Sequence, residues 1–128
     1  MQHTIYINVD PGPYNWGIVG SLNNEPGQLS NNQLIFRSDL REKNLLEIKF
    51  SGKNPLKFPD MCVKIQSMIF DYIDITPVLW SATHHTQHPD WRFISPCTDI
   101  NIDGTWVLKF SDSIVKDTIK TYLGVTSE

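Results

Sequence analysis

The sequence TWVLKFSDSIVKDTIKTYLG at residues 105–124 joins the clearest strand of this chain to its clearest helix. Residues 105–110 are rich in β-branched and aromatic side chains, which favours a strand. Ser111 and Asp112 are a typical helix start, since a serine oxygen accepts from free N–H groups and an aspartate complements the helix dipole. Gly124 stands where many helices end. This stretch therefore predicts a strand followed directly by a C-terminal helix.

The predicted C-terminal helix is amphipathic. Its apolar side chains recur at helical spacing and form one stripe, while lysines and other polar residues lie opposite. The members of the stripe are Ile114, Val115, Ile119, Tyr122 and Leu123. We expect this face to pack against a sheet, because a helix of this length gains most of its stability from burying its apolar side.

The sequence before this stretch predicts mainly strands. Alternating or β-branched runs indicate strands at residues 4–9, 16–20, 34–36, 45–50 and 77–82. Residues 23–32 are expected to form a long polar loop. We predict an α+β fold, a mainly antiparallel β-sheet with a C-terminal amphipathic helix, built as a single domain over residues 1–128.

The segment at residues 58–75 has an ambiguous pattern. Read as a helix, it places one apolar stripe on a single face, with Pro59 near the first turn. The stripe contains Met61, Ile65, Met68, Ile69, Tyr72 and Ile73. Read as a strand, it is a long run of β-formers with poor alternation. We predict a second helix near residues 60–73 and leave the strand as the alternative.

Composition and charge limit the classes of function. The chain has 128 residues, 40% of them hydrophobic, and a formal net charge of −3 without any basic run. We therefore expect no nucleic-acid partner, because phosphate binding uses clustered cations. The longest apolar stretch, residues 61–80, is interrupted by charges and a proline, so we expect no membrane segment. Cys62 and Cys97 do not make a disulfide framework, and we expect a cytoplasmic protein.

The order of predicted elements resembles the PH-like superfold in outline. In that family a curved seven-stranded sandwich has one end plugged by a C-terminal helix, and the resemblance here rests on residues 106–123. It implies a PH-like sandwich, whereas the residues alone equally allow helices packed on one face of a sheet. The predicted helix near residues 60–73 departs from the family pattern.

Three histidines lie close together in a predicted polar loop at residues 83–90. His84, His85 and His88 could in principle ligate zinc or copper. Pro89 disfavours the helix that would align two of them, and Cys97 is only a distant candidate for a further ligand. We therefore expect no metal and no other cofactor.

Two short patterns resemble nuclease motifs. Asp10-Pro11-Gly12 after the first strand resembles the first catalytic strand of RNase H-fold resolvases, in which such an aspartate binds metal. Asp39 followed by Glu47-Ile48-Lys49 resembles the PD-(D/E)xK nuclease pattern. Each resemblance implies a small Mg-dependent nuclease, which needs several carboxylates converging on one site. The acidic residues of this chain are scattered, so a nuclease is an alternative only.

The stretch from residue 80 to 93 combines aromatic side chains with a polar loop. Tryptophan and arginine are enriched among the residues that dominate binding energy. The candidate binding residues are Trp80, His84, His85, His88, Trp91 and Arg92. We predict a non-catalytic protein-binding domain of the inhibitor, immunity or adaptor type, with a protein partner. A structural subunit of a phage or secretion assembly is a further alternative.

Overall fold

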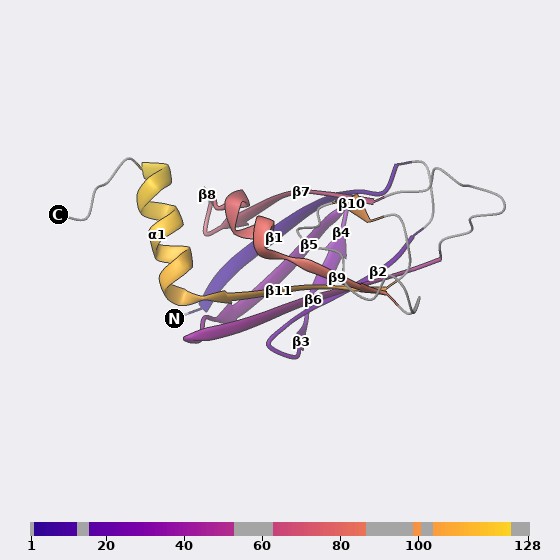
Figure 1. Cartoon of the computed structure of the whole chain (residues 1–128), viewed down its shortest axis with the longest axis horizontal. Helices are drawn as coiled ribbons and strands as arrows, with labels where there is room; N and C mark the ends of the chain where they lie inside the picture. The colour runs from indigo at the N-terminus through magenta and orange to yellow at the C-terminus, as the bar shows by residue number, and fades with distance from the viewer. Residues whose placement is uncertain (1, 13–15, 53–62, 87–98, 101–103, 124–128) are drawn as a thin grey trace.

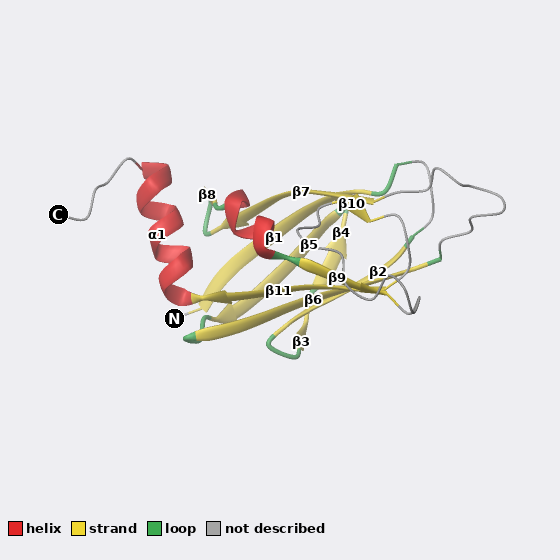
Figure 2. Ribbon diagram, viewed as in Figure 1, coloured by secondary structure: helices red, strands yellow, loops and turns green. Residues whose placement is uncertain are grey.

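The fold is a sandwich of two antiparallel sheets with a helix across one end (Figures 1 and 2). The computed structural model describes residues 2–12, 16–52, 63–86, 99–100 and 104–123. Sheet A contains β1 (Gln2–Asp10), β4 (Gln28–Ser30), β5 (Gln33–Asp39), β7 (Val63–Phe70), β8 (Ile73–Asp74) and β10 (Asp99–Ile100). Sheet B contains β2 (Gly17–Leu22), β3 (Glu25–Pro26), β6 (Lys43–Ser51), β9 (Thr83–Thr86) and β11 (Gly104–Ser111). The expectation of a mainly antiparallel sheet with a C-terminal helix is confirmed.

The core lies between the two sheets. Alternate residues of the central strands point inward and are almost wholly buried, as expected where one sheet face packs against another. Sheet A contributes Ile5, Ile7, Leu34, Phe36 and Met68, and sheet B contributes Leu46, Ile48, Phe50, Trp106 and Leu108. Trp16 packs edge-on against Phe50 with ring centroids 6.3 Å apart.

The predicted helix near residues 60–73 is wrong where the structure describes it, because Val63–Phe70 forms strand β7. Its buried residues are Val63, Ile65, Met68 and Phe70, so the inward spacing jumps from two to three after Ile65. The cause is a β-bulge: Asn8 pairs with Ser67 and Val9 with Ile65, which leaves Gln66 as an extra residue in β7. That extra residue shifts the alternation and imitates a helical i, i+3 spacing.

Two other short elements differ from the sequence prediction. Thr76–Ser81 forms a 3₁₀-helix, η1, instead of a strand, because Pro77 suits a first helical turn and the Asp74 carboxylate accepts from Thr76 N–H at 2.8 Å. The loop predicted at residues 83–90 contains edge strand β9 at Thr83–Thr86, which pairs with β11.

The C-terminal helix α1 (Asp112–Leu123) confirms the predicted element, and it crosses one end of the sandwich (Figure 1). Ser111 is its N-cap, with Oγ accepting from Ile114 N–H at 3.2 Å. Val115 is buried and Ile119 packs against the core, whereas Ile114 is 48% exposed and does not belong to the buried stripe. Neither helix in the described residues has the length and apolar content that crossing a bilayer requires.

Three hairpins of the sandwich close with two-residue turns in which both central residues have positive φ. Asn23 and Asn24 link β2 to β3, and Asn31 and Asn32 link β4 to β5, with φ between 49° and 67°. Asparagine tolerates this left-handed conformation, which gives the type I′ turn favoured in hairpins. The predicted long loop at residues 23–32 is therefore two tight turns joined by two short strands.

Candidate functional site

The predicted binding stretch at residues 80–93 falls largely outside the described residues. His85 is exposed on β9, and its Nε2 lies 3.0 Å from the Thr83 hydroxyl. Trp80 belongs to η1 and His84 to β9, but their side chains lie outside the described part. The remaining candidates, His88, Trp91 and Arg92, lie outside it entirely. This surface therefore stays a prediction.

The carboxylates of the two nuclease-like patterns do not converge. Asp10 is exposed at the end of β1, where its Oδ1 accepts from Gly12 N–H at 2.9 Å. Asp39 ends β5 in sheet A, whereas Glu47 lies on β6 in sheet B. Over the described ranges, no three His, Cys, Asp or Glu side chains gather closely enough to hold a metal ion.

A hollow lies at the helix end of sheet B. It has a volume of about 530 Å³ and is bordered by the β2–β3 turn, the start of β6, the end of β11 and the first turn of α1. We call it the basic cleft. Its lining residues are Asn23, Asn24, Arg41, Lys43, Asn44, Leu45, Lys109, Phe110, Ser111 and Ile114. A hollow of this size is within the range of ligand sites in proteins.

A network of buried amides forms the floor of the basic cleft. Asn44 Oδ1 accepts from Arg41 N–H at 2.9 Å and from Asn23 Nδ2 at 3.1 Å, and Asn44 Nδ2 donates to Arg41 O at 2.8 Å. Asn23 Oδ1 accepts from Leu45 N–H at 2.8 Å. Asn23 and Asn44 are 8% and 3% exposed, so these bonds satisfy polar groups that water does not reach. The two asparagines hold the cleft wall in a fixed shape.

Three exposed cations, Arg41, Lys43 and Lys109, line the cleft, and no described lining residue carries a carboxylate. Lys109 pairs with Leu45 across β11 and β6, which makes Lys43 and Glu47 its two diagonal neighbours on the same outer face, and of these two only Lys43 lines the cleft. At that spacing Lys43 repels Lys109, whereas Glu47 attracts it from the side away from the cleft. In a chain of net charge −3, the cleft concentrates positive charge at one place.

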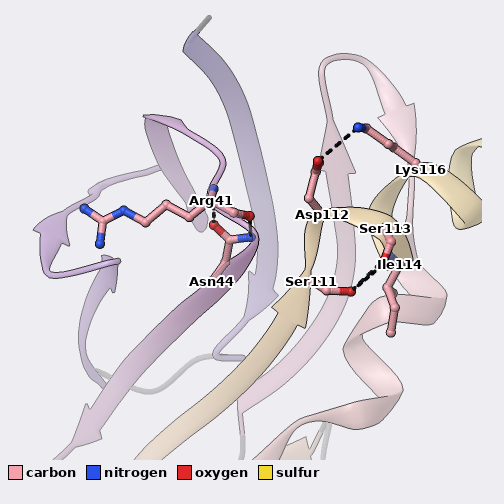
Figure 3. A network of polar contacts seen from close by, with 7 residues as sticks. All are labelled: Arg41, Asn44, Ser111, Asp112, Ser113, Ile114 and Lys116. Atoms are coloured by element: carbon pink, nitrogen blue, oxygen red, sulfur yellow. Dashed lines mark hydrogen bonds and ion pairs between the residues drawn. The ribbon is translucent and has the colours of Figure 1, made fainter.

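The first turn of α1 forms the far wall of the basic cleft and supplies its apolar part. Ile114 is 48% exposed and borders the hollow beside Phe110. The nearby carboxylate of Asp112 is paired with Lys116 at 3.0 Å, and Figure 3 shows this pair directed away from Ser111 and Ile114. In the same view the Arg41 side chain extends away from Asn44 (Figure 3). The cleft therefore places exposed cations beside one exposed aliphatic side chain.

A second unusual feature is the β7–β8 turn. Asp71 and Tyr72 have φ of 45° and 72°, and Tyr72 is 89% exposed. The Asp71 carboxylate accepts from Thr4 N–H at 2.9 Å and lies 2.5 Å from His3 Nδ1. Partial burial raises the pKa of Asp71, but the Thr4 and His3 contacts outweigh it and leave this pKa below its usual value. These contacts hold a bulky residue in a backbone region that it rarely occupies.

No protein-family model, curated protein or solved structure matches this chain. The basic cleft was not predictable from sequence, because its cations come from separate elements and form no run. One local pattern pointed to part of its border, since the adjacent Asn23 and Asn24 suit the tight turn that links β2 to β3. Nothing local in the sequence relates that turn to Lys109 of β11.

Proposed function

We propose that this chain is a non-catalytic protein-binding domain that holds an acidic segment of a protein partner in the basic cleft. The main support for this proposal is one hollow that has no lining carboxylate and is lined by three exposed cations, Arg41, Lys43 and Lys109. A partner carboxylate between Lys43 and Lys109 would replace repulsion with attraction. In this proposal the protein partner contacts the basic cleft through acidic side chains.

The shape and chemistry of the cleft favour binding of a peptide segment that has both acidic and apolar side chains. Lysine and arginine draw a carboxylate toward the site and set the rate and specificity of association. The exposed Ile114 offers apolar contact area beside them, and burial of such area supplies affinity that charge alone does not. The rigid asparagine floor limits the ordering cost of binding.

The proposal can be tested with a defined peptide. A labelled peptide of alternating glutamate and leucine should raise its fluorescence anisotropy when it is titrated with the protein. A peptide of equal length with lysine in place of glutamate should not bind. Replacing Lys43 and Lys109 together with serine should weaken binding by about tenfold or more, which corresponds to about 1.4 kcal/mol. Added salt should also weaken it, because exposed charges are screened.

The matched control for the double variant is Lys49→Ser. Lys49 is exposed on the same strand and the same sheet face as Lys43, but it does not line the cleft. Its replacement should leave peptide affinity unchanged within about twofold. Equal weakening by Lys49→Ser would mean that binding responds to net charge rather than to the cleft. Failure of the acidic peptide to bind at all would refute the proposal.

The aromatic stretch at residues 80–93 remains a second proposed contact surface for the partner. Once a partner is identified, Trp91→Ala should weaken its binding by more than about 2 kcal/mol with little loss of stability. If Trp91 is a core residue instead, stability should fall by about 3–5 kcal/mol. Measuring affinity and unfolding of the same variant separates these outcomes.

The proposal also keeps two finer expectations from the sequence. One is cytoplasmic residence, supported by a cysteine count of two, which is too few for a disulfide framework. The other is the PH-like comparison, supported by two packed sheets and a helix across one end. Eleven strands are described here against seven in that family, which limits the comparison to outline.

A further inference from the structure

The outer face of sheet A carries a row of neutral polar side chains that bond to one another. Asn8 Nδ2 donates to Ser67 Oγ at 2.7 Å, and Gln33 Nε2 donates to Asn8 Oδ1 at 3.0 Å. The row therefore crosses three neighbouring strands, β7, β1 and β5. Because these bonds fix the orientation of each amide, the donors and acceptors that remain free have defined directions.

The β-bulge in β7 adds a further polar group to this row. Gln66 is the residue without a partner on β1, and it is exposed next to the half-buried Ser67. In a regular strand these two successive side chains would lie on opposite faces. The buried residues on either side of them, Ile65 and Met68, show that both have left the core side. Bulges that redirect side chains in this way are frequent beside binding sites.

The Asn31-Asn32 turn closes the other side of the same surface. Val9 N–H donates to Asn32 O at 2.9 Å and ties the turn to β1. Between turn, strand and bulge lies a hollow of about 380 Å³, which we call the amide hollow. Its polar lining residues are Asn8, Asp10, Asn31, Asn32, Gln66 and Ser67. None of the described lining residues is a cation, and Asp10 is the single carboxylate among them.

An aromatic side chain lies beside the amide hollow. Tyr6 precedes Asn8 by two residues and so shares its outer face. It is half-buried, and Ile35 and Ile69 are its partners on the two adjacent strands. Sheet A thus presents an apolar row next to a polar hollow. A ligand that bridges the two needs an apolar face and many hydrogen-bonding groups.

We propose that the amide hollow binds a neutral polyhydroxylated ligand, a sugar. A hydroxyl group both donates and accepts, and the amides of Asn8, Asn31 and Gln66 offer both partners. The Asp10 carboxylate accepts from hydroxyl groups, and its cross-strand partner Lys64 lies outside the hollow lining. The C–H face of a pyranose ring suits contact with Tyr6. This site is on sheet A and is independent of the basic cleft on sheet B.

The test uses glucose, galactose, mannose and N-acetylglucosamine as probes, with inorganic phosphate as an anionic comparison. Each is titrated into isotope-labelled protein while the side-chain amide signals are followed by NMR. At least one sugar should shift the Asn8, Asn31 and Gln66 signals in a saturable way at millimolar concentration. If none of the four sugars does so, or if phosphate shifts the same signals more strongly, the proposal is wrong.

Two variants and one control make the test specific. Gln66→Ala removes an exposed amide, and Asn31→Gly removes another while keeping a residue that tolerates the positive φ of the turn. Each should weaken sugar binding by about tenfold. Gln28→Ala is the control, because Gln28 is an exposed amide of sheet A outside the hollow. Equal weakening by the control would contradict the assignment.

Discussion

The outer faces of the two sheets differ in whether their polar side chains bond to one another. On sheet A, Asn8 bonds to side chains of both neighbouring strands, so neutral groups satisfy one another. On sheet B, Lys43 and Lys109 border a cleft without a described carboxylate. Both faces belong to one sandwich with a shared core. The difference indicates that the core fixes the fold, while each outer face is free to acquire its own binding chemistry.

The shared core gives the first and largest test of this comparison. Ile7 in sheet A and Leu46 in sheet B are both fully buried. Replacing either one with alanine should cost about 2–5 kcal/mol of unfolding free energy, because each leaves a cavity between the sheets. Urea denaturation of the two variants measures this. A loss below about 1 kcal/mol for only one of them would mean that its sheet contributes little to the common core.

Polar groups on the two sheets should differ in their effect on stability. Asn44→Ala should cost about 2–3 kcal/mol, because it leaves the buried Asn23 amide and the Arg41 backbone without partners. Asn8→Ala should cost only about 0.5–1.5 kcal/mol, because water can reach its half-buried partners. Thermal unfolding of both variants checks the order. Equal losses would remove the distinction between a structural asparagine network and a surface one.

Part of this architecture was predictable from sequence, and the reasons for the failures are physical. The stretch at residues 105–123 combines strand propensity, a serine cap and an apolar stripe, and the structure agrees with all but Ile114 of the stripe residues it describes. A helix was wrongly predicted over residues 63–70, because one bulged residue, Gln66, breaks the alternation of buried and exposed side chains that marks a strand. The basic cleft depends on pairing between β6 and β11, which are distant in sequence. Such pairing cannot be predicted from the local sequence pattern of either strand.

The turns allow a smaller test on sheet A. Two of the three type I′ turns use asparagine, whereas the third places Tyr72 at φ 72°. Tyr72→Gly should raise the unfolding free energy by up to about 1 kcal/mol, since relief of strain exceeds the added freedom of the unfolded chain. Tyr72→Phe is the control and should change nothing, because the ring is exposed and φ stays strained. A destabilised glycine variant would show that the tyrosine ring itself supports the turn.

The smallest expected effect concerns the charge that anchors this turn. The folded-state pKa of Asp71 lies below the usual 3.8, so its carboxylate stabilises the fold fully above that pH. The contribution should decline as pH falls below 3.8 and be lost once the pH passes the lower folded value, because the unfolded chain then binds the proton first. The Asp71 carboxylate should contribute under about 1 kcal/mol to the free energy of unfolding, since its side chain is 40% exposed and water screens its pair with His3.

The Asp71→Asn variant isolates this contribution, because asparagine keeps an oxygen for Thr4 N–H but carries no charge. Denaturant unfolding of parent and variant should differ at neutral pH and converge in strong acid. Sheet B supplies a control, since Glu47→Gln removes one carboxylate from its outer face and matches the change in net charge. If Asp71→Asn and the parent lost stability in parallel throughout the acid range, the carboxylate would not anchor the turn through its charge.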